Sequence, residues 1–187
     1  MKFKNIFILS AGRCGSMTII RACEHITNYT SDHESGRLQK SHKKYNLIYP
    51  EYHIESDNRL TWFLGSLQKM YGNEAFYLKL TRNKKNIIDS YLMRKSFNQG
   101  IIPAYAINIF QQNKWKISKK GYKWAVEHYV NTSYNNIDYF LEDKQHKLEI
   151  DIDNPLDKFK LFWNNIQAKG NIQLALNEFS SNYNSSK

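Results

Sequence analysis

Cysteine, proline and long apolar runs are all scarce in this chain. It has two cysteines and three prolines among 187 residues, and no run approaches the roughly 18 consecutive apolar residues of a membrane-spanning helix. Two cysteines cannot build a disulfide framework, and no His or Cys cluster has the spacing of zinc ligands. These absences argue against a membrane span, a disulfide-stabilised scaffold and a metal site.

The composition is that of a folded domain. Hydrophobic residues make up 41% of the chain and aromatic residues 14%, which is enough for a sizeable core and too many for a disordered chain. A chain of this length fits one compact domain. We therefore expect a single domain over residues 1–187, in which the polar residues 180–187 form a frayed tail.

Basic residues outnumber acidic ones, 27 to 17, which gives a formal net charge of +10. Such an excess is typical of proteins that bind nucleic acids, phosphorylated cofactors or acidic glycans. The excess is mostly lysine and is spread along the whole chain. A compositional bias on a solvated surface therefore explains it equally well.

The N-terminus has some features of a secretion signal. Lys2 and Lys4 precede the apolar residues 6–9, but a signal peptide needs an apolar run of about 7–15 residues. Arg13 also stands directly before Cys14, where a lipoprotein cleavage site needs a small residue. The segment is better interpreted as a buried first strand, and we expect a cytoplasmic protein.

Strand-like segments alternate with helix-like ones. The predicted strands are residues 3–9, 28–31, 75–80 and 147–150, and the predicted helices are residues 16–25, about 57–71, 84–97, 121–141 and a last one from 154–155 onward. Residues 35–55 are polar and poorly periodic, so we expect a loop there. The alternation predicts an α/β fold with a parallel sheet of about four to five strands flanked by helices. In such sheets ligands bind beyond the carboxyl ends of the strands.

The first candidate site is the turn Gly12-Arg13-Cys14-Gly15-Ser16, between a predicted strand and a predicted helix. Glycines let the backbone approach an anion, and a helix N-terminus offers free N–H groups and positive dipole. Arg13 adds a planar donor fork for phosphate or sulfate. The nucleotidase loop G-x-x-x-x-G-K-[ST] is absent, because no Lys precedes Ser16.

The second candidate site combines Arg82, at the end of a predicted strand, with Ser90, about two turns into the next helix. Together the two segments strongly resemble PAPS-dependent sulfotransferases, in pattern closest to the carbohydrate sulfotransferases. That family has the turn S-x-G-R-x-G-[ST], here residues 10–16, and a later strand followed by Arg and, eight residues on, Ser. The resemblance implies a three-layer P-loop-like fold and 3′-phosphoadenosine 5′-phosphosulfate (PAPS) as cosubstrate, without a metal.

The resemblance also assigns roles. The 5′-phosphosulfate would lie on the first turn, and Arg82 and Ser90 would hold the 3′-phosphate. Arg13 would stabilise the transferring sulfuryl group electrostatically. The residues of the first turn that it assigns to the cofactor are Ala11, Gly12, Arg13, Cys14, Gly15, Ser16 and Met17. A closing R-K-G segment of the family is matched only by Lys169 and Gly170, without the Arg.

The third candidate site is His33-Glu34, after the predicted second strand. Many carbohydrate sulfotransferases have a catalytic glutamate at this point, so the resemblance implies Glu34 as general base, with His33 as its orienter or substitute. A base within hydrogen-bond reach of the acceptor hydroxyl is typically worth about 10²–10⁴-fold in rate. We therefore expect sulfuryl transfer to a hydroxyl or amine of a small-molecule or glycan acceptor, with a saccharide preferred and no nucleic-acid partner.

Three alternatives remain to be compared with this one. A P-loop-type nucleotide kinase is disfavoured by the missing loop Lys. A non-catalytic nucleic-acid-binding module would use the basic surface, with affinity that falls steeply with salt. Cys14 near a helix N-terminus suggests a phosphatase-type nucleophile, but Arg21 is one position too late for the C-x₅-R motif. Nothing in the sequence indicates the oligomeric state.

Overall fold

A computed structural model describes residues 2–35, 47–94, 100–111 and 118–181 of the chain. Its centre is a five-stranded sheet of order β2-β3-β1-β4-β5 in which every pairing is parallel. The strands are β1 (Asn5–Leu9), β2 (Thr30–His33), β3 (His53–Ser56), β4 (Phe76–Thr81) and β5 (Lys147–Asp151). The predicted α/β class with a parallel sheet of four to five strands is thereby confirmed.

The central strand β1 shows why this sheet forms. Ile6 and Ile8 belong to one apolar cluster, whereas Phe7 and Leu9 belong to a second. Alternate side chains of a strand point to opposite faces, so β1 is covered on both faces. This is the reason that residues 6–9 of β1 are uninterruptedly apolar.

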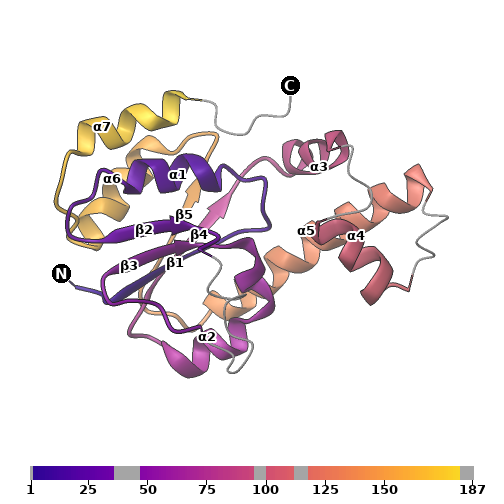
Figure 1. Ribbon diagram of the computed structural model, residues 1–187, viewed down its shortest axis with the longest axis horizontal. Coiled ribbons are helices and arrows are strands. Elements are labelled where there is room, and N and C mark those ends of the chain that lie inside the picture. Colours follow the sequence, from indigo (N-terminus) through magenta and orange to yellow (C-terminus); the bar gives the residue numbers. More distant parts are fainter. Residues whose placement is uncertain (1, 36–46, 95–99, 112–117, 182–187) are drawn as a thin grey trace.

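Helices cover both faces of the sheet (Figure 1). Helices α1 (Ser16–Cys23), α6 (Leu156–Asn165) and α7 (Ile172–Asn177) lie on one face. Helix α2 (Leu64–Met70) and the C-terminal half of α5 (Lys119–Leu141) lie on the other. The N-terminal half of α5 extends past the sheet, beside α3 (Lys84–Met93) and α4 (Ile101–Ala104). The sheet is therefore the middle layer of three, and α3 to α5 form a wall at one end of it.

The expected loop over residues 35–55 is corrected by the structure, because β3 begins at His53 within it and pairs with both β2 and β1. The sequence His-Ile-Glu-Ser contains one apolar residue, which is why periodicity does not detect it. Residues 36–46 lie outside the described residues.

Several other boundaries also differ from the sequence-based ones. The predicted helix over about residues 57–71 is a 3₁₀ turn (Asn58–Trp62) followed by α2. The side chain of Asp57 caps the 3₁₀ turn by accepting from Arg59 N. β2 runs to His33 instead of ending at 31. Helix α3 ends at Met93, and residues 95–97 lie outside the described residues, as do 182–187 of the expected tail.

The segment after Gly100 contains two elements that were not predicted. Helix α4 continues into a π-helix at Tyr105–Ile109, although Gly100 and Pro103 are of the residue types least favourable in a helix. Pro103 is tolerated because a proline in the first turn needs no intrahelical hydrogen bond to its nitrogen. Among the described stretches, no helix combines the length and the apolarity that crossing a bilayer requires.

Candidate functional site

One cavity of about 930 Å³ lies at the carboxyl ends of the strands. The residues that follow β1, β2, β3, β4 and β5 all contribute to its lining, and α4 and Tyr122 of α5 form the facing wall. Polar side chains that line it include Arg13, Ser16, His33, Glu34, Arg82 and Ser90. The three turns that the sequence singled out thus meet in one place.

The turn after β1 is held in a conformation that requires its glycines. Gly12 and Gly15 have φ of 77° and 78°, a region that residues with a Cβ rarely adopt. A Cβ on Gly12 would collide with the hydroxyl of Tyr91, and one on Gly15 would collide with Ile152. The Tyr91 hydroxyl in turn donates to Ala11 O at 2.7 Å. Close packing from α3 and from the end of β5 therefore shapes this turn.

Helix α1 begins at Ser16 and points its N-terminus at the cavity. Its N-cap residue is Gly15, whose lack of a side chain leaves no side-chain cap. The first N–H groups of a helix have no partner within the helix, and here Ser16, Met17 and Thr18 line the cavity. A helix N-terminus of this kind favours an anionic group.

The first two turns contact each other directly. Arg13 Nε donates to Ser90 Oγ at 2.9 Å, across 77 positions of the chain. Arg82 Nη1 donates to Arg13 O at 3.4 Å. Both arginines therefore reach the same end of the cavity, at the N-terminus of α1.

This end of the cavity is electropositive. Burial lowers the pKa of Arg13, and the nearby charges of Arg94 and Arg82 lower it further. Arg82 Nε is buried and lies 3.5 Å from Asp153 Oδ1, but no partner among the described residues is aligned to accept a hydrogen bond from it. A bound anion would relieve the repulsion between the guanidinium groups and could accept from such donors.

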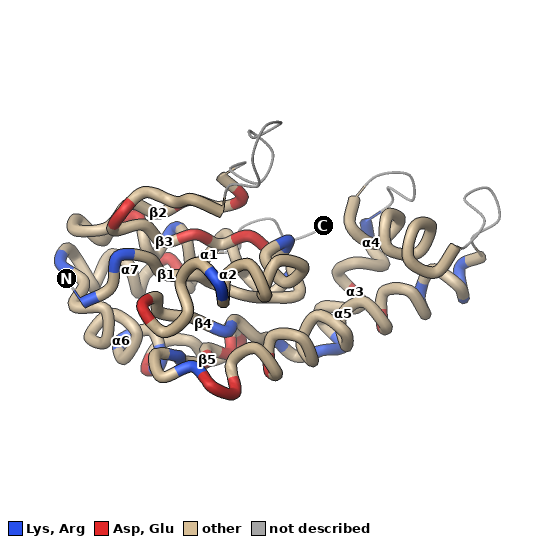
Figure 2. The backbone as a smooth tube through the Cα atoms, turned by 90° about the horizontal axis from the view of Figure 1, so that it is seen from below, with Lys and Arg blue, Asp and Glu red and all other residues tan. Residues whose placement is uncertain are grey.

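Arginine is concentrated at the cavity, and lysine is not. The chain has six arginines among its 27 basic residues, and four of the six line the cavity: Arg13, Arg59, Arg82 and Arg94. No described lysine lines it, although Lys and Arg are spread over most elements of the molecule (Figure 2). Since an arginine offers a rigid fork of donors and a lysine only a point charge, the cavity is suited to tetrahedral oxyanions.

The turn after β2 brings an imidazole next to the arginine end of the cavity. His33 Nε2 lies 2.9 Å from Ser16 Oγ, at the start of α1. Glu34 is exposed, has a left-handed backbone with φ of 50°, and donates its N–H to Ser56 O at 2.9 Å. An imidazole and a carboxylate are thus available within the cavity for proton transfer.

Arg59 lines the cavity near Glu34, and the buried Asp57 holds its guanidinium group in place. Arg59 Nη2 is 2.6 Å from Asp57 Oδ2, and Nε is 2.8 Å from Oδ1. These hydrogen bonds raise the pKa of Arg59, and the charge of Glu34 raises it further. A pre-oriented guanidinium therefore neighbours Glu34.

Two residues of the first turn do not reach the cavity. Ala11 and Cys14 are fully buried behind it, and Cys14 Sγ donates to Gly12 O at 2.9 Å. Desolvation by burial raises the pKa of Cys14 to about 11. A thiol with that pKa is protonated at neutral pH, which argues against the phosphatase-type nucleophile.

The assignment of Lys169 and Gly170 to the cofactor is not supported by their position. Gly170 pairs with Ile26, and Lys169 O accepts from Thr27 N at 2.7 Å. Both contacts follow the C-terminal end of α1, whose eight residues span about 12 Å. The two residues therefore lie at the opposite end of α1 from the cavity, in the connection between α6 and α7.

Sequence reasoning missed Asn58, Arg59, Arg94 and Asp153, all of which line the cavity. The first two follow β3, which was not recognised as a strand. Asp153 follows β5, where its carboxylate accepts from Asn83 N at 3.0 Å. The chain has far fewer arginines than lysines. This scarcity was an available signal that Arg59 and Arg94 could belong to the site.

Among the described residues, no group of three or more His, Cys, Asp and Glu side chains could hold a metal ion. No protein-family model matches the chain. A search of the curated proteins gives no significant match either.

Proposed function

We propose that this chain is a sulfotransferase that moves the sulfuryl group of PAPS to a hydroxyl or amine of a small-molecule or glycan acceptor. The observation that carries the proposal is the contact between the two anion motifs. Arg13 and Ser90, 77 positions apart, are joined at 2.9 Å beside the N-terminus of α1, and Arg82 reaches the same turn. Two anionic groups of one nucleotide would need such paired donors.

The cosubstrate fits this arrangement in charge and size. Its 5′-phosphosulfate would accept from the N–H groups of the turn and the start of α1, and its 3′-phosphate from Arg82 and Ser90. A cavity of about 930 Å³ is within the range of about 300–1,000 Å³ that ligand sites commonly have. Arg13, Arg82 and Arg94 would offset part of the phosphate and sulfate charge. Positioning and electrostatics of this kind dominate catalysis in phosphoryl transfer.

The transfer needs one proton to move. The acceptor oxygen loses its proton to a base as it forms the new bond to sulfur, while the bond between sulfur and the phosphate oxygen breaks. Adenosine 3′,5′-bisphosphate leaves with the electron pair. Glu34 is the base in this proposal, and His33, whose Nε2 lies 2.9 Å from Ser16 Oγ, orients it or takes its place. Arg13 would act by charge, since a guanidinium group stays protonated in proteins.

A saccharide acceptor is favoured only by the resemblance of the His33-Glu34 motif, since a fold does not specify a substrate. The alternatives are a nucleotide kinase and a nucleic-acid-binding module. A kinase loop uses a Lys against the β- and γ-phosphates, and no described lysine lines this cavity.

Calorimetry with adenosine 3′,5′-bisphosphate, AMP and ATP tests the proposal. We expect the bisphosphate to bind and AMP to bind much more weakly, because AMP lacks the group that Arg82 and Ser90 would hold. Arg82→Ala removes charge-assisted hydrogen bonds of about 1.5–3 kcal/mol, which corresponds to roughly a 10- to 150-fold loss of bisphosphate affinity. Arg21→Ala is the matched control, because Arg21 pairs with Glu24 near the other end of α1.

The controls discriminate among the three functions. Equal binding or no binding of all three nucleotides would contradict the sulfotransferase proposal. Tight binding of ATP with weak binding of the bisphosphate would favour the kinase. Affinity for DNA or RNA that falls steeply with salt, without discrimination among the nucleotides, would favour the nucleic-acid-binding module.

A further inference from the structure

Strand β3 and the residue after it carry three buried ionisable side chains in alternation: His53, Glu55 and Asp57. Their relative exposures are 1%, 0% and 2%, and residues two apart on a strand share a face. A buried carboxylate is costly unless it is charge-balanced and hydrogen-bonded. The partners of these groups therefore indicate why they are inside.

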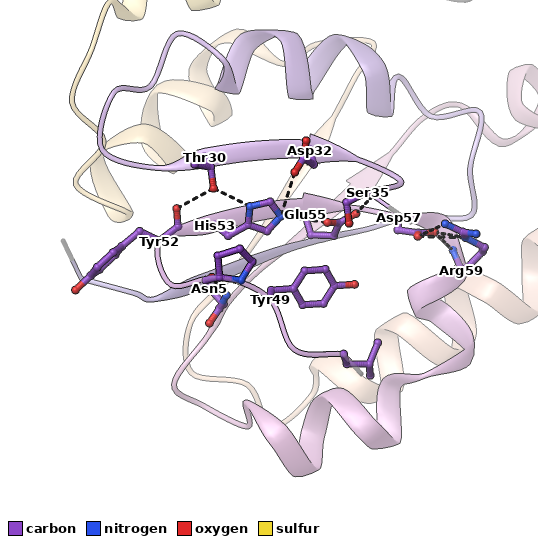
Figure 3. Close-up of polar contacts among 12 residues, drawn as sticks. Asn5, Thr30, Asp32, Ser35, Tyr49, Tyr52, His53, Glu55, Asp57 and Arg59 are labelled. Carbon is purple, nitrogen blue, oxygen red and sulfur yellow. Dashed lines mark hydrogen bonds and ion pairs between the residues drawn. The ribbon is translucent and has the colours of Figure 1, made fainter. Parts of the chain in front are cut away.

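Glu55 has two partners, one for each carboxylate oxygen. Its Oε2 lies 3.1 Å from His53 Nε2, and its Oε1 accepts from the backbone N–H of Ser35 at 3.0 Å. The other ring nitrogen of His53, Nδ1, lies 2.8 Å from Thr30 Oγ1. Figure 3 shows these contacts beside β3, from Thr30 of β2 to Ser35, and shows Asp57 and Arg59 as a separate ion pair after the end of β3.

The Ser35 amide is the one that follows Glu34. The backbone of Glu34 is left-handed, with φ of 50°, a conformation that costs energy for a residue with a Cβ. Its own N–H donates to Ser56 O, and the next N–H donates to Glu55. β3 thus holds the amides on both sides of the Glu34 Cα, and through them the direction in which the His33-Glu34 turn faces the cavity.

We propose that Glu55 is a positioning residue that holds the His33-Glu34 turn in place for proton transfer from the acceptor, an inference that rests on the sulfotransferase proposal. The side chain of Glu55 is fully buried and does not line the cavity. Its Oε2 contacts His53 Nε2 at 3.1 Å, and His53 is flanked by the Asp32 carboxylate at 4.0 Å and by the ring of Tyr49, stacked at 5.7 Å. Helices α1 and α3 would hold PAPS, the sulfuryl donor. Among the described hydrogen bonds, none joins Glu55 to either helix.

The test compares Glu55→Ala and Glu55→Gln with wild type, and Glu51→Gln serves as the matched control. Glu51 is an exposed residue, paired only with Lys4 in the described structure, shortly before β3. Three quantities are measured: hydrogen exchange of the Ser35 amide by NMR, the Kd of adenosine 3′,5′-bisphosphate, and the rate of sulfate release from PAPS with water as acceptor. Water makes the rate measurable before the natural acceptor is identified.

In Glu55→Ala we expect faster exchange at Ser35 and a kcat lowered about 10- to 100-fold, because a displaced base loses its orientation. The KM for PAPS and the Kd of the bisphosphate should stay within about twofold, because α1, Arg82 and Ser90 are untouched. In Glu55→Gln an amide oxygen can still accept from Ser35, so kcat should recover in part. Glu51→Gln should match wild type in all three.

A folded Glu55→Ala with wild-type kcat, or with an unchanged exchange rate at Ser35, would overturn the positioning role. So would a loss of bisphosphate affinity equal to the loss of kcat, because it indicates general damage. Should Glu55→Ala not fold, Glu55→Met, which has a similar volume but offers no oxygen to the Ser35 amide, carries the same test. If the wild-type protein neither binds the bisphosphate nor releases sulfate, both proposals are overturned. If the wild type does both and Glu55→Ala does so equally well, only the positioning role is overturned.

Discussion

Burial acts on two side chains behind the cavity in the same direction. It raises the pKa of Cys14 from 9.0 to about 11 and that of Tyr129 from 10.0 to about 12. In both groups the deprotonated form carries the charge, so the unfolded chain releases these protons at lower pH than the folded one. Their contribution to the free energy of unfolding is therefore fully present below about pH 9 and is lost as pH rises toward 12.

Chemical denaturation at several pH values measures this loss. We expect the free energy of unfolding to fall between about pH 9 and pH 12, with each group contributing at most about 1.4 kcal/mol per pH unit. Cys14→Ser keeps a donor for Gly12 O but does not titrate in this range, so its curve should fall less steeply between pH 9 and 11. A variant curve parallel to that of wild type would show that Cys14 does not titrate as its burial implies.

Asn83 shows how a single element depends on its cap. Its side-chain oxygen accepts from Lys85 N at 3.0 Å and from Asn86 N at 3.3 Å, at the start of α3. Asn83→Ala should lower the free energy of unfolding by about 1 kcal/mol, because these N–H groups lose their partner. Asn83→Asp should keep most of the stability, since a carboxylate caps equally well and complements the helix dipole.

Thermal melting followed by circular dichroism checks this prediction. The backbone contact from Asn83 N to Asp153 remains in both variants, so the comparison isolates the cap. Equal melting temperatures for Asn83→Ala and wild type would mean that packing of Ile87 and Tyr91 alone maintains α3.

For the molecule as a whole, the cavity joins segments that are far apart in the chain. A ligand there would contact the turns after β1 and β4 at once. The turn after β1 also packs on Tyr91 of α3 at Gly12 and on Ile152, which follows β5, at Gly15. Adenosine 3′,5′-bisphosphate at about 100 times its Kd should therefore raise the free energy of unfolding by about 2.7 kcal/mol. For a domain of this size, such a gain corresponds to a rise in Tm of roughly 5–11 °C.

AMP at the same concentration is the control and should shift the Tm by much less. Arg82→Ala should reduce the shift caused by the bisphosphate, whereas Arg21→Ala should not. An equal shift from AMP and from the bisphosphate would show that the cavity does not recognise the 3′-phosphate. Higher salt should diminish the shift, because salt screens the charges through which the proposed ligand would bind.

Local patterns were sufficient for part of the fold and of the site. The apolar run of β1 and the glycines beside Arg13 are contiguous in sequence, so their meaning could be inferred without knowing what packs on them. Arg82 and Ser90 are eight residues apart, and one strand–turn–helix unit brings them to the same side. By contrast, the position of Lys169 and Gly170 depends on pairing with Ile26, which no local pattern encodes.

The sequence by itself determined the α/β class, β1, and the three turns that carry Arg13, His33 and Arg82, because each of these depends on neighbours within about ten residues. Only the tertiary structure decided that β3 lies between β2 and β1, that Arg59 and Arg94 join the cavity, and that Glu55 holds the amide after Glu34. The reason is physical: a polar strand such as β3 is stabilised by partners distant in the chain. The burial of its charges is therefore not visible in its own periodicity.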